Sequence, residues 1–191
     1  PPRSTLFPST TLFRSATEWN YGDPEPDVDL DRFRGVLFRG FEGNYVEAYH
    51  RTFDLPFVVT DYDTTWLTVD PKPVRPMVVC RTARYRDNAA DETWREMAQT
   101  GNLKELGVFV GNLDEHADFV RLTNVEIPFY GVKDFLELAQ IVAGAELVMA
   151  NQNFVYSLAM GLGKQAMLET WKGKPLQQNE CFFPRTNIQY F

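Results

Sequence analysis

Apolar residues in the second half of the chain alternate between the spacing of a helix and that of a buried strand. After residue 133 they recur at i, i+3, i+4 and i+7, which is one face of a helix: Phe135, Leu138, Ala139 and Val142. Asp134 with Glu137 three residues later has the form of a capping box and would begin this helix. The continuous apolar run at 147–150 then indicates a strand that is covered on both faces.

The same alternation extends in both directions along the chain. Downstream, a polar stretch at 151–153 leads into a second helix, and a further strand is expected at 166–169. Upstream, helical stretches separate short apolar runs at 77–80, 108–110 and 127–130. Residues 181–183 form either a last strand or a packing cluster. Strands that alternate with short helices predict an α/β fold with a Rossmann-like, doubly wound parallel sheet.

Prolines indicate where the domains divide. Pro71, Pro73 and Pro76 favour an extended connector, so residues 74–191 are expected to form the Rossmann-like domain. Residues 16–73 would be the tail of a preceding domain and a linker, with a helix near 45–52. Residues 5–15 resemble the translation of a sequencing adapter, so residues 1–15 are expected to be an artefact or, alternatively, a disordered leader. An adapter junction would make the chain a fragment.

Composition and charge exclude several classes of function. The chain has 191 residues, of which 44% are hydrophobic, and its net charge of −7 argues against sequence-independent binding to nucleic acid. Two cysteines far apart argue for a reducing compartment and against structural zinc. No apolar run approaches the roughly 20 residues that span a bilayer, so no transmembrane segment is expected. Two histidines are too few for a multi-histidine site, and neither a metal nor a cofactor is predicted.

Three arginines follow the strand expected at 77–80, in the loop that reads Arg-Thr-Ala-Arg-Tyr-Arg from residue 81. Ligands of open α/β sheets lie beyond the carboxyl ends of strands. Guanidinium groups match phosphate oxygens, which makes Arg81 and Arg84 candidates for binding phosphate. The alternative is a solvated basic loop that pairs with nearby acids. Tyr85, together with Tyr130 and Trp171, could stack on a base or a sugar.

Three consecutive amides, Asn151, Gln152 and Asn153, follow the strand expected at 147–150. The N–H groups at the start of the next helix would favour a diphosphate, although Asn153 could simply cap that helix. Glu169, at the end of the following strand, could accept hydrogen bonds from a sugar hydroxyl or could be a paired surface acid. The Gly-rich dinucleotide and P-loop motifs are absent from the sequence, so neither standard phosphate site is supported.

The run from Asp134 to Lys164, DFLELAQIVAGAELVMANQNFVYSLAMGLGK, resembles the C-terminal domain of heptosyltransferase-like glycosyltransferases. The wider pattern is VVCRTARY, then GVFVGNLDEHADF, then this run, then LET and FPRTNIQYF. The resemblance is to a divergent branch of family 9-like enzymes with the GT-B fold. It covers about 74–191, and residues 30–70 look like the end of the preceding domain.

The resemblance implies transfer of a sugar from a nucleotide-diphosphate donor to a glycan or lipopolysaccharide-like acceptor, without a metal. Arg81 and Thr82 fall where the family's first loop meets the donor phosphates. Gln152 stands where the family has Asp, and Ser157 where its His precedes Leu-Ala. The catalytic carboxylate would come from the N-terminal domain, so no catalytic residue is assigned in this chain. Such an enzyme would lie in the cytoplasm, where that domain could attach it to the inner membrane face.

Three hypotheses follow for the function. The first is the donor-binding half of a glycosyltransferase. The second is a non-catalytic nucleotide- or glycan-binding module, which the departures at Gln152 and Ser157 favour. The third is a Rossmann-like interaction domain that binds no small ligand.

Overall fold

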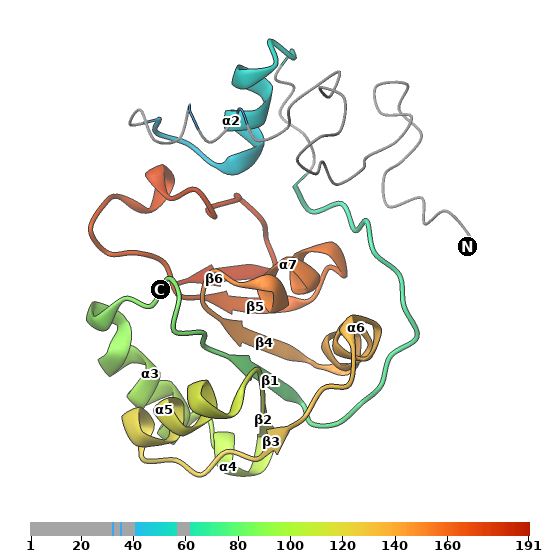
Figure 1. The fold of residues 1–191 in the computed structure, drawn as a ribbon, viewed down its shortest axis with the longest axis vertical. Helices are drawn as coiled ribbons and strands as arrows, with labels where there is room; N and C mark the ends of the chain where they lie inside the picture. Colours follow the sequence, from blue (N-terminus) through green and yellow to red (C-terminus); the bar gives the residue numbers. More distant parts are fainter. Residues whose placement is uncertain (1–31, 33–34, 36–40, 57–61) are drawn as a thin grey trace, which may run out of the picture.

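The structure, a computed structural model, describes residues 32, 35, 41–56 and 62–191. Its centre is a sheet in which all neighbouring strands are parallel (Figure 1). The strands are Met77–Cys80 (β1), Gly107–Val110 (β2), Phe129–Tyr130 (β3), Leu147–Ala150 (β4), Gln165–Leu168 (β5) and Ile188–Tyr190 (β6). Their order is β3-β2-β1-β4-β5-β6, which is the arrangement of a Rossmann fold. The predicted fold class is confirmed.

Helices cover both faces of the sheet, as predicted for a doubly wound fold (Figure 1). One face carries Asp91–Thr100 (α3), Leu103–Leu106 (α4) and Leu113–Thr123 (α5), and the other carries Phe135–Gly144 (α6) and Phe154–Gly161 (α7). The chain stays on the first face until β3 and then crosses to the second face through α6. The order of the strands therefore reverses between β1 and β4, which lie next to each other.

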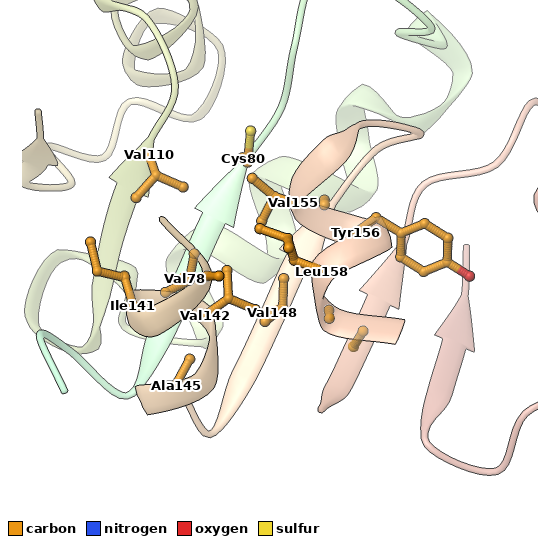
Figure 2. Close-up of a cluster of buried hydrophobic side chains, with 14 of the residues drawn as sticks. Val78, Cys80, Val110, Ile141, Val142, Ala145, Val148, Val155, Tyr156 and Leu158 are labelled. Carbon is orange, nitrogen blue, oxygen red and sulfur yellow. The ribbon is translucent and has the colours of Figure 1, made fainter. Parts of the chain in front are cut away.

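The two faces bury separate apolar cores. Between the sheet and helices α6 and α7, Val78, Val148 and Ile141 are among the side chains that are almost completely buried (Figure 2). On the other face, Trp94 of α3 and Phe119 of α5 pack edge to face, with their ring centroids 5.5 Å apart. Each fully buried side chain of this size contributes about 1.5–3 kcal/mol. Strands β1 and β4 therefore read as unbroken apolar runs, because both of their faces are covered.

The structure differs from the sequence prediction at several elements. The last strand is β6, and residues 181–183 form no strand, so only the packing-cluster alternative holds: Phe183 is buried. The third strand is limited to β3, because Pro128 before it has no N–H to donate to a neighbouring strand. Helix α6 begins after Asp134, as predicted, but the Glu137 carboxylate accepts from Lys133 N instead of completing a capping box.

The connector before β1 packs along the helices of the second face. The backbone N–H groups of Trp66 and Leu67 both donate to Gly161 O, at 2.9 and 2.8 Å. At Gly144, an added Cβ would lie 2.6 Å from the carbonyl carbon of Lys72, so only glycine admits this approach. Residues 65–73 thus form a strap over α6 and α7. The domain boundary at residue 74 stays a prediction.

The helix Tyr45–Thr52 (α2) is confirmed and begins with a capping box between Asn44 and Glu47. It lies beyond the end of the sheet, next to the loop before β6 (Figure 1), and Tyr45 N donates to Glu180 O at 2.9 Å. The artefact or leader expected at residues 1–15 lies outside the described residues. Among the described residues, no helix combines the length and apolar character needed to cross a membrane.

Candidate functional site

The candidate site is the rim of the sheet where β1 and β4 end. Cys80 and Ala150, the last residues of these strands, are paired in register. The loop that starts at Arg81 and the loop that starts at Asn151 therefore leave the sheet side by side. Open α/β sheets bind ligands at this place, outside the carboxyl ends and at the point where strand order reverses.

Asn151 joins the two loops through its fully buried side chain. Its Oδ1 accepts from Thr82 N at 3.0 Å and from Thr82 Oγ1 at 3.2 Å. Its Nδ2 donates to Thr82 O and to Arg84 O, both at 3.0 Å. A carboxylate could make only the first pair of contacts, because it has no hydrogen to donate. The two predicted loops are thus held together as one unit, which we call the Asn151 latch.

Asn153 caps α7, which was one of the two roles that the sequence predicted for it. Its Oδ1 accepts from Val155 N at 2.9 Å and Tyr156 N at 3.2 Å, which satisfies two of the free N–H groups at the helix start. Its Nδ2 donates to Cys80 O at 3.0 Å. The cap therefore also fastens α7 to the end of β1.

A buried ion pair lies beneath the loop, on the α3 side. Arg81 contacts Glu169 through Nε at 2.7 Å and through Nη2 at 3.1 Å, and its Nη1 lies 2.8 Å from Asp91. Glu169 also accepts from Trp94 Nε1 and from Asp87 N, both at 2.6 Å. Burial disfavours the charged form of Arg81, but the hydrogen bonds and charges of Glu169 and Asp91 outweigh it, so its pKa is raised. The positive charge of Arg81 and the negative charge of Glu169 are thus both paired with groups of the protein.

The three loop arginines have different environments. Arg81 is buried in the pair above, and Arg86 forms an ion pair with Asp118 at 3.3 Å. Arg84 is exposed, and its guanidinium lies 4.8 Å from the centroid of the Tyr85 ring. Among the described residues, no carboxylate pairs with Arg84. It is therefore the cation of this loop that is available to an incoming anion.

A cleft of about 250 Å³ opens beside the amide-rich loop, between α7, α2 and the loop before β6. Its lining is aromatic and neutral polar: Tyr45, Tyr85, Gln152, Asn153, Tyr156, Ser157, Met160, Cys181 and Phe183. Burial raises the pKa of Cys181 to about 12, and burial also raises the pKa of Tyr156. The described residues that line the cleft are therefore neutral polar, aromatic or apolar.

Hydrogen bonds hold the far wall of the cleft in place. Gln152 Nε2 donates to Asn179 Oδ1 at 3.2 Å, and Asn179 is fully buried. Tyr156 extends its hydroxyl away from the apolar core (Figure 2), and the hydroxyl donates to Cys181 O at 3.4 Å. The loop before β6 is thereby tied to both the amide-rich loop and α7.

The structure brings most of the predicted residues to one rim: Thr82, Arg84, Asn151, Gln152, Asn153 and Ser157. Arg81 and Glu169 lie together below it, bonded to each other, and their direct contacts with a donor stay predictions. Of the three aromatic residues considered for stacking, Tyr85 lines the cleft and Trp171 does not. Tyr130 accepts a hydrogen bond from Lys72 Nζ instead. Tyr45 and Phe183 were not predicted as site residues, because only long-range packing brings them to the cleft.

Two solved structures of the E. coli heptosyltransferase WaaC are similar to the chain. WaaC with ADP-2-deoxy-2-fluoro heptose has a TM-score of 0.49 and 16% identity, over 76% of this chain and 47% of that chain. WaaC with ADP has a TM-score of 0.41 and 19% identity, over 60% and 37%. The chain thus spans less than half the length of WaaC, a member of the family that the sequence resembles. No protein-family model and no curated protein matches the chain.

Proposed function

We propose that this chain binds a nucleotide-diphosphate sugar at the rim between β1 and β4, as the donor-binding half of a glycosyltransferase. The observation that carries the proposal is the juxtaposition of the two loops. The Asn151 latch holds the arginine-bearing loop against the amide-rich loop where the strand order reverses. A rim of this kind suits a diphosphate, and the neutral cleft beside it suits a ring with hydroxyl groups.

Each part of the rim has a task in this proposal. Arg84 neutralises the diphosphate, because its guanidinium is exposed and meets no carboxylate of the described residues. Gln152 and Ser157 line the cleft and supply neutral donors and acceptors to the sugar. Arg81 and Glu169 hold the loop from below through Asp87 N, which donates to Glu169. Stabilisation of the departing diphosphate would be the main contribution of this half to catalysis.

The acceptor would be a glycan or a lipopolysaccharide-like molecule, and transfer would need a base from another part of the protein. Among the described residues that line the cleft, none carries a carboxylate or an imidazole. That composition also favours the second candidate, a non-catalytic nucleotide- or glycan-binding module. Binding of a nucleotide sugar without transfer to any acceptor, measured on the full-length gene product, would decide for the module.

Calorimetric titration with UDP, ADP and GDP and their hexose conjugates tests the proposal. Arg84→Glu should weaken binding of the preferred ligand at least tenfold, about 1.4 kcal/mol or more, because a charge-assisted phosphate contact becomes a repulsion. Lys104→Glu is the matched control: it makes the same charge change on α4, which directly precedes β2 and therefore lies at the amino ends of the strands, away from the rim. Absence of binding to every ligand, or equal effects of the two variants, would refute the phosphate site.

A further inference from the structure

Tyr85 has a backbone conformation that bulky residues seldom adopt. Its φ is +62°, in the left-handed region. In the described part of the chain, the other non-glycine residues with positive φ are Asp54, Asn102 and Asn124. Asp and Asn tolerate this region because their short polar side chains bond locally, whereas a tyrosine gains nothing comparable. Folding alone does not explain a tyrosine at this position.

The neighbouring contacts fix the backbone on the N-terminal side of Tyr85. Arg84 O accepts from Asn151 Nδ2 at 3.0 Å and from Thr82 Oγ1 at 2.9 Å. Ala83 N donates to Glu115 Oε1 at 2.9 Å. Strained residues persist where the surroundings determine the conformation, and they concentrate at functional sites. The Asn151 latch thus imposes the geometry that Tyr85 adopts.

Tyr85 is 52% exposed, although it lines the cleft. Arg84 lies over the Tyr85 ring at 4.8 Å. Tyr45 and Phe183 add aromatic surface, and Gln152 and Ser157 add neutral hydrogen-bonding groups. An aromatic wall with neutral polar groups suits an uncharged ring that has one apolar face and polar substituents.

We propose that Tyr85 is a ligand-binding residue that stacks on an uncharged ring, and that the latch holds it in a strained conformation for this purpose. The proposal rests on the proposed function only for the kind of ring, which would be the base or the sugar of the donor. If it is the base, loss of Tyr85 weakens the binding of nucleoside diphosphates and of nucleotide sugars alike. If it is the sugar, loss of Tyr85 weakens only the binding of nucleotide sugars.

The test compares Tyr85→Asn and Tyr85→Phe with the parent chain. Tyr85→Asn should unfold at an equal or higher urea concentration, because asparagine accepts the left-handed conformation. The reciprocal change at a remote left-handed position, Asn124→Tyr, calibrates the strain and should lower the urea midpoint. By calorimetry with the nucleotide panel above, Tyr85→Asn should weaken binding at least fivefold, and Tyr85→Phe should stay within about twofold.

Saturation-transfer NMR with free glucose, uridine and adenosine at millimolar concentration provides a reading that needs no diphosphate. Suppose that saturation is transferred to one of these free compounds by the parent chain but not by Tyr85→Asn, and that no nucleotide binds. That result would sustain the proposal for Tyr85 and refute the nucleotide-sugar function. Nucleotide sugars that bind Tyr85→Asn as tightly as the parent would overturn the proposal for Tyr85 and leave the function standing. A lowered urea midpoint of Tyr85→Asn, or a parent that binds no ring compound, would also overturn it.

Discussion

Replacing Asn151 with aspartate should break the Asn151 latch while changing the shape of the side chain very little. The two bonds from Asn151 Nδ2, to Thr82 O and Arg84 O at 3.0 Å, would be lost. A carboxylate oxygen would face those two carbonyl oxygens instead, at a position with no exposed surface. The amide orientation is determined by its surroundings, because Thr82 N needs an acceptor and the two carbonyls need donors.

The expected cost is about 3–5 kcal/mol at pH 7. Each lost hydrogen bond costs about 1 kcal/mol, and the remainder comes from a buried charge without a cationic partner. Domains of this size have a total stability of about 5–15 kcal/mol, so the loss would be a large part of the whole. The effect should depend on pH. Burial and the two carbonyls would raise the pKa of the new carboxyl group above its ordinary value of about 3.9.

The sign of the pH effect follows from that shift. A raised pKa in the folded state means that stability is retained below about pH 4 and lost as the pH rises through the folded-state pKa. The deficit of Asn151→Asp relative to the parent should therefore shrink on acidification. Urea unfolding followed by tryptophan fluorescence, to which buried Trp94 contributes, measures it. Asn124→Asp, at the exposed C-cap of α5, is the control and should cost no more than about 1 kcal/mol. Equal urea midpoints for parent and Asn151→Asp at pH 7 would refute the latch.

Three further changes test the ion pair beneath the rim and the contacts of the strap with α6. Glu169→Gln should cost about 3 kcal/mol by urea unfolding, because Arg81 keeps its charge and loses its closest buried carboxylate; an unchanged midpoint would contradict this. The hydrogen bond with Lys72 is the main cause that lowers the pKa of Glu137 to about 2, so the stability it provides should be present above about pH 4.5 and lost towards pH 2. The gap in urea midpoint between parent and Glu137→Gln should therefore close over that interval, and a constant gap would show that the charge has no role. Gly144→Ala should cost about 1–3 kcal/mol by displacing the strap, whereas Gly131→Ala, where an added Cβ meets only ordinary contacts, should be neutral.

The order of helices and strands could be predicted because buried parallel strands require continuous apolar runs. Residues 77–80 and 147–150 satisfy that requirement in the sheet centre and were recognised. The edge strand β6 could not be recognised in this way, because Ile188 is buried, Gln189 is exposed and Tyr190 is partly buried. The denser apolar cluster at 181–183 gave a stronger signal, although it serves packing. Local hydrophobicity identifies central strands better than edge strands.

The position of the candidate site could also be predicted, since carboxyl ends of neighbouring parallel strands meet at one rim. The partners of its side chains could not. Arg81 and Glu169 are 88 positions apart, and their pairing depends on Trp94 of α3, which donates to the same carboxylate. An arginine after a strand is equally compatible with phosphate and with a buried acid until packing decides. The cleft likewise needs Tyr45 from α2, which belongs to the segment expected to precede the domain.

Two buried polar residues explain how an irregular loop can be rigid enough to hold Tyr85 in place. A loop without regular structure leaves its N–H and C=O groups to be satisfied by other partners. Asn151 satisfies both kinds at Thr82, because an amide can donate and accept at once. Glu169 accepts from Asp87 N at the other end of the loop, while Arg81 neutralises its charge. The loop is therefore fixed at both ends by groups that face inward, which leaves Arg84 and Tyr85 between them exposed to a ligand.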